Sequence, residues 1–296
     1  MNGATAPLSK QRTPYGPRPA HTTETPGQKF AEVIALPVRA AGPMRGVSSM
    51  NNSSEYQTQK NEQRGVAELQ LLGGFRLTIG GRLVDVGRTG QRLLAVVACR
   101  GRQASRSQIA HALWPDTTSD RAHANLRTAL YRLSRRAPDI LYATASYLQL
   151  GMGVQIDIET ATRAANRILS EDPVPDQTLL AEVLRANLYE DLLPDWDEEW
   201  LGDHQYRHRQ LRLTALEKLS ADLATAGHHG AAVQAALAAV QADALRDSAH
   251  ETLIRACLAQ GNRHEAYTHY TAYRRILRDE LGLDPPADHG RLLASA

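Results

Sequence analysis

The feature that most constrains the fold is a near-repeat of 34 residues in the C-terminal half of the chain. Gly227 and Gly261 stand at corresponding positions of the two copies, and Ala232 and Ala266 keep the same step. In each copy, a glycine suited to ending one helix precedes an alanine that lets the next helix pack closely. The repeat therefore predicts stacked helical hairpins, since a single hairpin cannot bury its own apolar face.

The apolar periodicity is helical throughout from about Asp157 onward. Gly282 and the two prolines at 285–286 predict a glycine C-cap and a stop for the last long helix. A helix–turn–helix period of about 34 residues is that of tetratricopeptide repeats. We therefore expect residues 152–296 to form an all-α, tetratricopeptide-like domain.

Residues 66–151 have a different pattern, which begins with short strands. Residues 68–71 alternate weakly between apolar and polar side chains, and residues 75–79 alternate cleanly. Gly80-Gly81 is a hairpin turn signal, and residues 82–86 follow it as the next predicted strand. A second hairpin is expected over residues 140–150. The class predicted for the whole chain is thus α+β, with a sheet-containing domain ahead of the helical one.

Three helical patterns lie between the two predicted hairpins. They cover residues 91–99, 105–113 and 120–136. Ser105 and Gln108 have the spacing of a capping box at the start of the second helix. A sheet, three helices and a hairpin in this order predict a winged-helix domain over residues 66–151, with the last hairpin as the wing.

Charge divides the chain in the same way. Residues 66–151 hold twelve arginines against five acids, whereas residues 152–296 hold fourteen basic residues against twenty-three acids. A basic block beside an acidic block indicates two domains with different partners, and the basic block is the candidate for nucleic acid.

Several function classes are disfavoured by the composition. No apolar run approaches the roughly 18–20 residues of a membrane span, and the N-terminus has no apolar signal region. The two cysteines, Cys99 and Cys257, lack metal-ligand spacing. These observations predict a cytoplasmic protein without a disulfide scaffold or a membrane partner. Residues 1–65 are rich in Pro, Gly and polar residues, which predicts a disordered tail or a miscalled start of the gene.

The third predicted helix carries the clearest functional signal. Turning about 100° per residue places one apolar stripe on it, made of Ala122, Leu126, Ala129, Leu130 and Leu133. The opposite face carries Arg121, Thr128, Arg132 and Arg135, with Asn125 at its flank. Arginine can pair with guanine, asparagine with adenine, and threonine can touch the thymine methyl group, so this face suits a DNA major groove. A solvated basic face is the alternative.

Six further residues are candidates for DNA contacts outside this helix. Arg88, Arg102 and Arg106 flank predicted helix starts and could clamp phosphates, or could be scattered surface arginines. Thr144, Ser146 and Tyr147 lie at or beside the tip of the predicted wing. A plain solvated turn explains these three nearly as well.

Two parts of the chain resemble one known family, in the same order. Residues 71–151 are similar to the OmpR-type winged helix of the Streptomyces antibiotic regulatory proteins, and residues from about Asp157 resemble that family's bacterial transcriptional activation domain. The stretches that carry the resemblance are 72–75, 91–94, 107–115, 125–133, 147–150, 261–266 and 279–285.

The resemblance implies a pathway-specific activator of secondary-metabolite, typically antibiotic, genes. Members bind direct repeats in double-stranded DNA that overlap the promoter −35 region, and they recruit RNA polymerase holoenzyme. Tandem protomers on such repeats would form a homo-oligomer on DNA. Larger relatives append an ATPase, but no Gly-x-x-x-x-Gly-Lys-Ser/Thr motif occurs here. We therefore expect no cofactor and no enzymatic activity.

Two other functions compete with this interpretation. The helical half could be a protein-interaction scaffold whose basic domain binds polyanions without sequence preference. His204 and His208 stand four residues apart, a spacing that can hold zinc, although no third ligand stands in register. The acidic, aromatic stretch 195–200 suits either a protein contact or a helix cap with its tryptophans turned inward.

Overall fold

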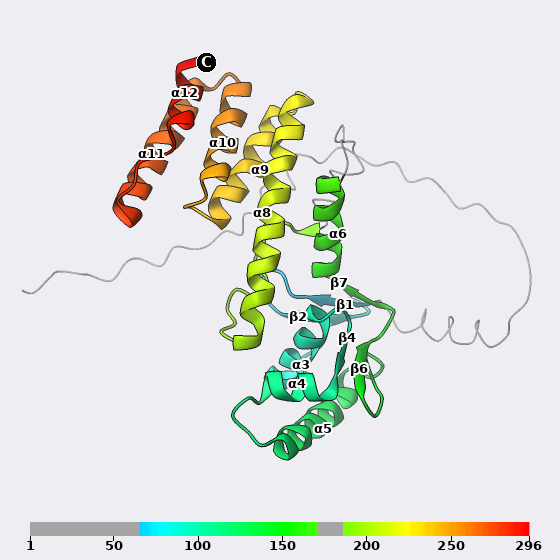
Figure 1. Cartoon of the computed structure of the whole chain (residues 1–296). Helices are drawn as coiled ribbons and strands as arrows, with labels where there is room; N and C mark the ends of the chain where they lie inside the picture. Colours follow the sequence, from blue (N-terminus) through cyan, green and yellow to red (C-terminus); the bar gives the residue numbers. More distant parts are fainter. Residues whose placement is uncertain (1–65, 171–185, 296) are drawn as a thin grey trace, which may run out of the picture. The chain divides into compact units, whose positions relative to one another are not determined.

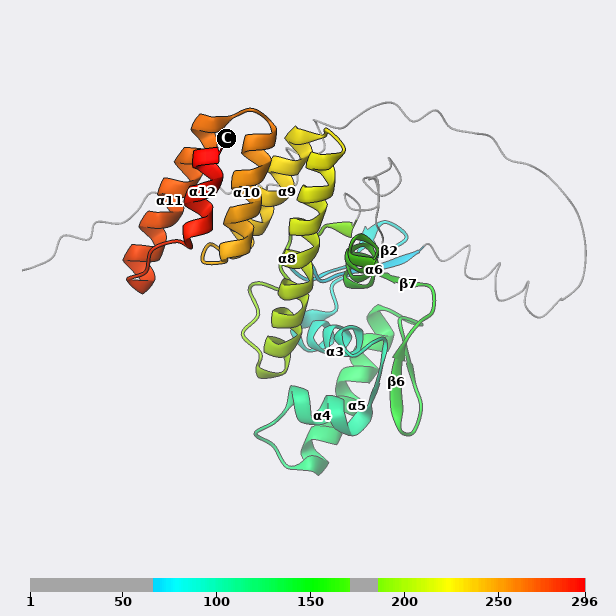
Figure 2. The same ribbon diagram turned by 45° about the horizontal axis from the view of Figure 1, so that its top comes forward.

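The computed structural model describes residues 66–170 and 186–295, and the predicted tail over residues 1–65 lies outside them. Small sheets and three helices come first, and the remainder is mostly helical (Figures 1 and 2). No helix in the described part of the chain is both long and apolar enough to cross a lipid bilayer.

The first sheet combines strands from two distant parts of the sequence. Its order is β3 (Arg82–Leu83), β2 (Arg76–Ile79), β1 (Ala67–Gln70) and β7 (Val154–Ile156). The first three strands are antiparallel, and β7 pairs with β1 in parallel. Gly80 and Gly81 have φ angles of +59° and +73°, which is the left-handed geometry of a tight hairpin turn and confirms that prediction.

Three helices follow this sheet as the sequence predicts. They are α3 (Gly87–Cys99), α4 (Arg106–Leu113) and α5 (Ser119–Arg136). Ser105 and Gln108 form the expected capping box: the Ser105 side chain accepts from the Gln108 backbone N–H, and the Gln108 side chain accepts from the Ser105 backbone N–H. The apolar faces of α3 and α5 meet in one core, which includes Leu93, Leu126 and Leu133.

A second sheet completes this part of the chain. β5 (Leu141–Ala143) and β6 (Tyr147–Leu150) form the predicted hairpin. β6 also pairs with β4 (Gln103–Ser105), a short strand ahead of α4 that the sequence analysis did not anticipate. The three helices with the β5–β6 hairpin have the order of a winged helix.

Helical segments make up most of the rest of the described chain. They are α6 (Asp157–Ser170), the 3-10 helix η1 (Glu199–Leu201), α8 (Gly202–Thr225), α9 (His229–Ala242), α10 (Asp247–Ala259), α11 (Arg263–Leu281) and α12 (Ala287–Ser295). From α8 to α11 each helix packs against the next. Gly227 and Gly261 follow α8 and α10 with φ near +80°, and both repeat alanines, Ala232 and Ala266, are fully buried.

The prediction of helix throughout is wrong at residues 187–198, which form turns and one β-bridge. Besides turns of its own, the backbone of this segment forms hydrogen bonds with the end of β1 and the residues that follow it. Leu192 bridges to Leu72, and the Gly73 N–H donates to the Asp191 carbonyl at 2.8 Å. Long-range pairing of this kind leaves no periodic signal in the sequence.

Asp157 joins the first sheet to the helices. It begins α6 directly after β7, and its carboxylate accepts the backbone N–H groups of Leu71 and Leu72 at 2.8–3.0 Å. Burial raises the pKa of Asp157, and these N–H groups oppose that rise by favouring the carboxylate. One side chain therefore ties the end of β1 to the start of the helical region.

Candidate nucleic-acid interface

The helix α5 is amphipathic in the manner predicted. Ala122, Leu126, Ala129 and Leu133 are at most 5% exposed, and Leu130 is half-buried against the core. Asp120 is the only acid of the helix and lies in its first turn, where the helix dipole favours a negative charge. Burial of one stripe fixes which side chains α5 presents to solvent.

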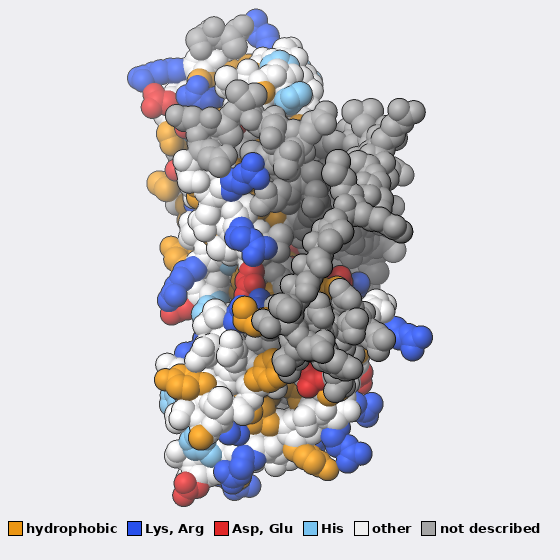
Figure 3. All heavy atoms as spheres, turned by 90° about the vertical axis from the view of Figure 1, so that its right-hand side faces the viewer, with side chains coloured by type: hydrophobic (Ala, Val, Ile, Leu, Met, Phe, Trp, Pro, Cys, Tyr) orange, Lys and Arg blue, Asp and Glu red, His pale blue; other side chains and the backbone are white. Residues whose placement is uncertain are grey.

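The outward face of α5 carries the predicted candidates. Arg121, Thr128, Arg132 and Arg135 are exposed, and Asn125 is half-buried at the edge. Arg135 donates to the Tyr131 hydroxyl at 3.1 Å, which orders that pair of side chains. Arg121 and Arg132 have no ion pair with any residue in the described ranges. On the face shown in Figure 3, several basic side chains lie at the lower end of the molecule, at the height where Figure 1 draws α5.

Two hollows lie on opposite sides of α5. One has a volume of about 500 Å³ and lies against the start of α3; Asn125, Thr128 and Arg132 line it together with Arg88. The other, of about 490 Å³, lies toward the wing. The exposed crest of α5 between them carries Thr128, Tyr131 and Arg135.

The wing-side hollow combines residues of three elements. Arg106 comes from α4, His123 and Arg127 from α5, and Ser146 and Tyr147 from the tip of the β5–β6 hairpin. His123 and Arg127 were not among the residues predicted from the sequence, because they lie on α5 between the apolar stripe and the predicted basic face. Arg127 is exposed and has no ion pair with any described residue.

The wing tip is held by internal hydrogen bonds. The Thr144 hydroxyl accepts from the Ser146 and Tyr147 backbone N–H groups at 3.3 and 3.0 Å. Arg106 donates to the Thr144 carbonyl at 2.9 Å. Thr144 and Arg106 thus shape the tip, while the Tyr147 side chain stays 47% exposed.

Arg102 and Arg88, two of the arginines predicted to contact phosphates, form contacts with other residues of the chain. Arg102 donates to Glu159 at 2.7 Å and to the carbonyls of Gly151 and Val154 at 2.7 and 2.9 Å. These bonds tie the wing to β7 and α6 and leave little of its guanidinium for DNA. Arg88 is 53% exposed but pairs with Glu198 at 3.5 Å, and its guanidinium stacks over the Trp196 ring.

His204 and His208, the pair considered for zinc, both lie on α8. No group of three or more His, Cys, Asp or Glu side chains suited to a metal ion occurs among the residues of the described ranges. His208 is 6% exposed, and burial lowers its pKa to about 4, with Arg212 adding to the effect. Burial likewise raises the pKa of the Cys99 thiol to about 12, which disfavours its thiolate form.

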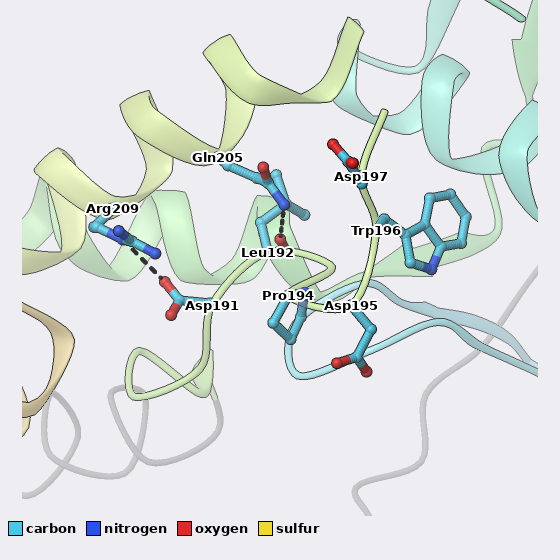
Figure 4. A pocket seen from close by; sticks show the side chains of 8 residues that line it. All are labelled: Asp191, Leu192, Pro194, Asp195, Trp196, Asp197, Gln205 and Arg209. Atoms are coloured by element: carbon cyan, nitrogen blue, oxygen red, sulfur yellow. Dashed lines mark hydrogen bonds and ion pairs between the residues drawn. The ribbon is translucent and has the colours of Figure 1, made fainter. Parts of the chain in front are cut away.

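A further hollow of about 370 Å³ lies at the irregular segment 187–198 (Figure 4). Asp191, Asp195, Asp197, Gln205 and Arg209 are among its lining residues. Asp191 pairs with Arg209, and the Gln205 amide donates to the Leu192 carbonyl at 3.1 Å. Trp196 points away from Gln205 and Arg209 in Figure 4, and its indole stacks on Phe75 of the first sheet region.

The helical half of the chain matches the model of a known family. Residues 181–294 match the family model of the bacterial transcriptional activator domain. Regulatory protein AfsR of Streptomyces coelicolor is 31% identical over 240 residues, which are 76% of this chain and 24% of that protein. The chain is of the Streptomyces antibiotic regulatory protein type.

Further relatives extend the likeness to this family. Regulatory protein AfsR of Streptomyces griseus is 29% identical over 238 residues, which are 73% of this chain and 23% of that protein. The chain spans about a quarter of the length of the curated relatives it matches. Both matches cover most of the chain and thus reach beyond the activator domain.

A solved structure has the same fold. Mycobacterium tuberculosis EmbR, in complex with a low-affinity phosphopeptide, superposes with a TM-score of 0.59 at 20% sequence identity. The match covers 77% of this chain and 64% of EmbR. At this identity the likeness concerns the fold: a sheet-containing winged-helix region followed by a helical region.

Proposed function

We propose that this chain is a sequence-specific transcriptional activator that inserts α5 into the major groove of double-stranded DNA. The observation that carries the proposal is the exposed face of α5, whose arginines have no ionic partners in the described chain and which stands between two hollows. A helix in the major groove has a phosphate backbone on each side. The two hollows lie where those backbones would run.

The residues divide into two groups in this arrangement. Thr128 and Arg135, with Tyr131, stand on the crest of α5 and would face base edges. Arg121, Asn125 and Arg132 on one flank would hold one backbone, and Arg127 with Arg106, Ser146 and Tyr147 would hold the other. Thr144 acts through the shape of the wing tip, and Arg102 is omitted because its guanidinium is used inside the chain.

For the helical half we propose two tetratricopeptide-like hairpins, α8–α9 and α10–α11, which contact RNA polymerase holoenzyme. The 34-residue step between the two left-handed glycines and the sequential packing of these helices support this arrangement. The family suggests promoters of antibiotic biosynthetic genes with direct repeats near the −35 region, on which protomers would bind in tandem.

The test is selection of random duplex DNA by the full chain near physiological salt. We expect enrichment of short repeats spaced by about one helical turn. Matched variants separate specific from general attraction: Arg135→Ala on the crest should relax sequence preference, whereas Arg127→Ala should weaken binding to all duplexes and lower the salt dependence. Folded protein that enriches no sequence would favour the scaffold function instead.

A further inference from the structure

The segment 187–201 runs from the first sheet to the start of α3 and holds the winged-helix region at two places. At its beginning, the Leu193 N–H donates to the Leu71 carbonyl at 2.9 Å, beside the Leu72–Leu192 bridge. At its end, Glu198 lies beside the first turns of α3. We call residues 187–201 the strap.

Glu198 is the centre of the second contact. Its carboxylate is 11% exposed and accepts from Arg92 at 2.6 Å, from the Trp200 indole at 3.1 Å and from Arg88 at 3.5 Å. Arg92 also donates to the Leu113 carbonyl at the end of α4. The Arg92–Glu198 contact is short, and the Leu113 carbonyl also holds Arg92. The Arg88–Glu198 contact is longer, so Arg88 is the arginine that can exchange Glu198 for another partner.

Trp196 supplies the other surface that holds Arg88. The Arg88 guanidinium carbon lies 3.9 Å from the centre of the Trp196 ring, a cation–π distance. Trp196 is 8% exposed and stacks on Phe75, with ring centres 6.0 Å apart. The strap therefore offers Arg88 a carboxylate and an aromatic face at one time.

The same arginine lines the α3-side hollow. Arg88 shares that hollow with Asn125, Thr128 and Arg132 of α5. A phosphate in the hollow would form charge-assisted hydrogen bonds with Arg88, and it would be repelled by the Glu198 carboxylate behind it. The Arg88 guanidinium thus lies between the Glu198 carboxylate and the hollow that a DNA phosphate would occupy.

We propose that Arg88 is shared between Glu198 and a DNA backbone phosphate, so that DNA binding is coupled to the hold of the strap on α3. This inference rests on the proposed function and adds a means of regulating it. In free protein the strap draws Arg88 toward Glu198 and Trp196. When DNA occupies the hollow, Arg88 turns to the phosphate, and of the two arginines on α3 only Arg92 still holds Glu198. Coupling is reciprocal: whatever loosens the strap makes Arg88 available and strengthens DNA binding.

The test uses the full chain and the duplex enriched in the selection experiment, with fluorescence anisotropy as the binding measurement. Glu198→Gln keeps an acceptor for Arg92 but removes the competing charge, and we expect DNA to bind about fivefold more tightly, at the lower end of typical couplings. Glu199→Gln is the matched control, since Glu199 is exposed and forms no ion pair within the described residues. In an Arg88→Ala background the Glu198→Gln gain should disappear.

A second readout follows the strap with Glu198 intact. The chain has three tryptophans, so indole N–H resonances assigned by Trp→Phe substitution report each one separately. DNA should shift the Trp196 resonance of the wild-type chain, and Arg88→Ala should remove that shift. This measurement keeps the test valid if a Glu198 variant folds poorly.

The outcomes separate cleanly. Equal gains from Glu198→Gln and Glu199→Gln would overturn the coupling in favour of general charge repulsion, and so would a full gain in the Arg88→Ala background. An unchanged affinity of Glu198→Gln, or an unshifted Trp196 resonance on bound DNA, would also overturn it. If the wild-type chain binds no duplex at all, the proposed function itself fails, a result distinct from all of these.

Discussion

Three arginines of α5 and three arginines of the helical region have opposite surroundings. In the helical region Arg212, Arg246 and Arg278 pair with Asp191, Glu217 and Asp284 at 2.6–2.9 Å. On α5, Arg121, Arg127 and Arg132 have no acidic partner in the described chain. A positive charge that a protein pairs internally serves its own structure, whereas a row of unpaired ones is available to an external anion.

The largest expected effect comes from removing the carboxylate that pairs with Arg212. Arg212 is 1% exposed, and Asp191 accepts from it at 2.8 Å. Asp191→Ala leaves a buried charge without its counterion, and we expect the free energy of unfolding to fall by about 3–5 kcal/mol. Urea unfolding followed by circular dichroism measures this. The double variant Asp191→Ala/Arg212→Met should regain most of the loss; a loss below about 1 kcal/mol in the single variant would contradict the argument.

Acid should weaken the same region through His208. Burial lowers the pKa of His208 to about 4, below its ordinary value, so between these values the unfolded chain binds more protons than the folded one. Stability is therefore full above about pH 6.5 and falls by about 2–3 kcal/mol on acidification to pH 4.5. We expect His208→Gln to flatten this fall in urea unfolding at stepped pH. Identical pH profiles for the variant and the wild type would remove His208 from the explanation.

Arg132→Ala should affect DNA and leave folding unchanged. Because Arg132 would hold a backbone phosphate, we expect its loss to weaken binding to all duplexes alike and to lower the salt slope by about 1, while the free energy of unfolding stays within about 0.5 kcal/mol of wild type. Arg278→Ala is the control on the paired side, and its duplex affinity should equal that of the wild type. Equal duplex affinities of Arg132→Ala and Arg278→Ala would contradict the proposed difference between the unpaired arginines of α5 and the paired arginines of the helical region.

The smallest effect is expected from an exposed ion pair on α8. Asp203 and Arg207 are four residues apart, 3.6 Å from oxygen to nitrogen, and both side chains are more than 70% exposed. A double-mutant cycle to alanine should give a coupling energy of at most about 0.5 kcal/mol in unfolding experiments. A coupling above about 1 kcal/mol would indicate that exposed pairs, too, carry part of the stability of the helical region.

Local patterns in the sequence predicted most of the elements and the apolar stripe of α5. The capping box at Ser105, the Gly80-Gly81 turn and the spacing of Leu126 and Leu133 depend on neighbours a few residues away, so they can be read directly. β4 and β7 are three residues each, too short for a periodic signal, and they form only because distant strands lie beside them.

The site was less predictable than the helices. Arg121, Arg132 and Arg135 lie on the expected face because helical geometry alone decides it. Arg102 and Arg88 are bound by Glu159 and Glu198, which stand 57 and 110 residues away, and no local pattern indicates such pairs. The wing-side hollow was missed because it needs α4, α5 and the hairpin placed together.

The position of β7 has a consequence for synthesis. β7 forms one edge of the first sheet, and the ribosome synthesises it more than eighty residues after β1. Asp157 can bond to the backbone at the end of β1 only after β7 has emerged. Until then β1 is an open edge that can pair with other chains. Folding of the winged-helix region therefore waits for the first residues of the helical region, and a protein truncated at Gly151 would keep that edge open permanently.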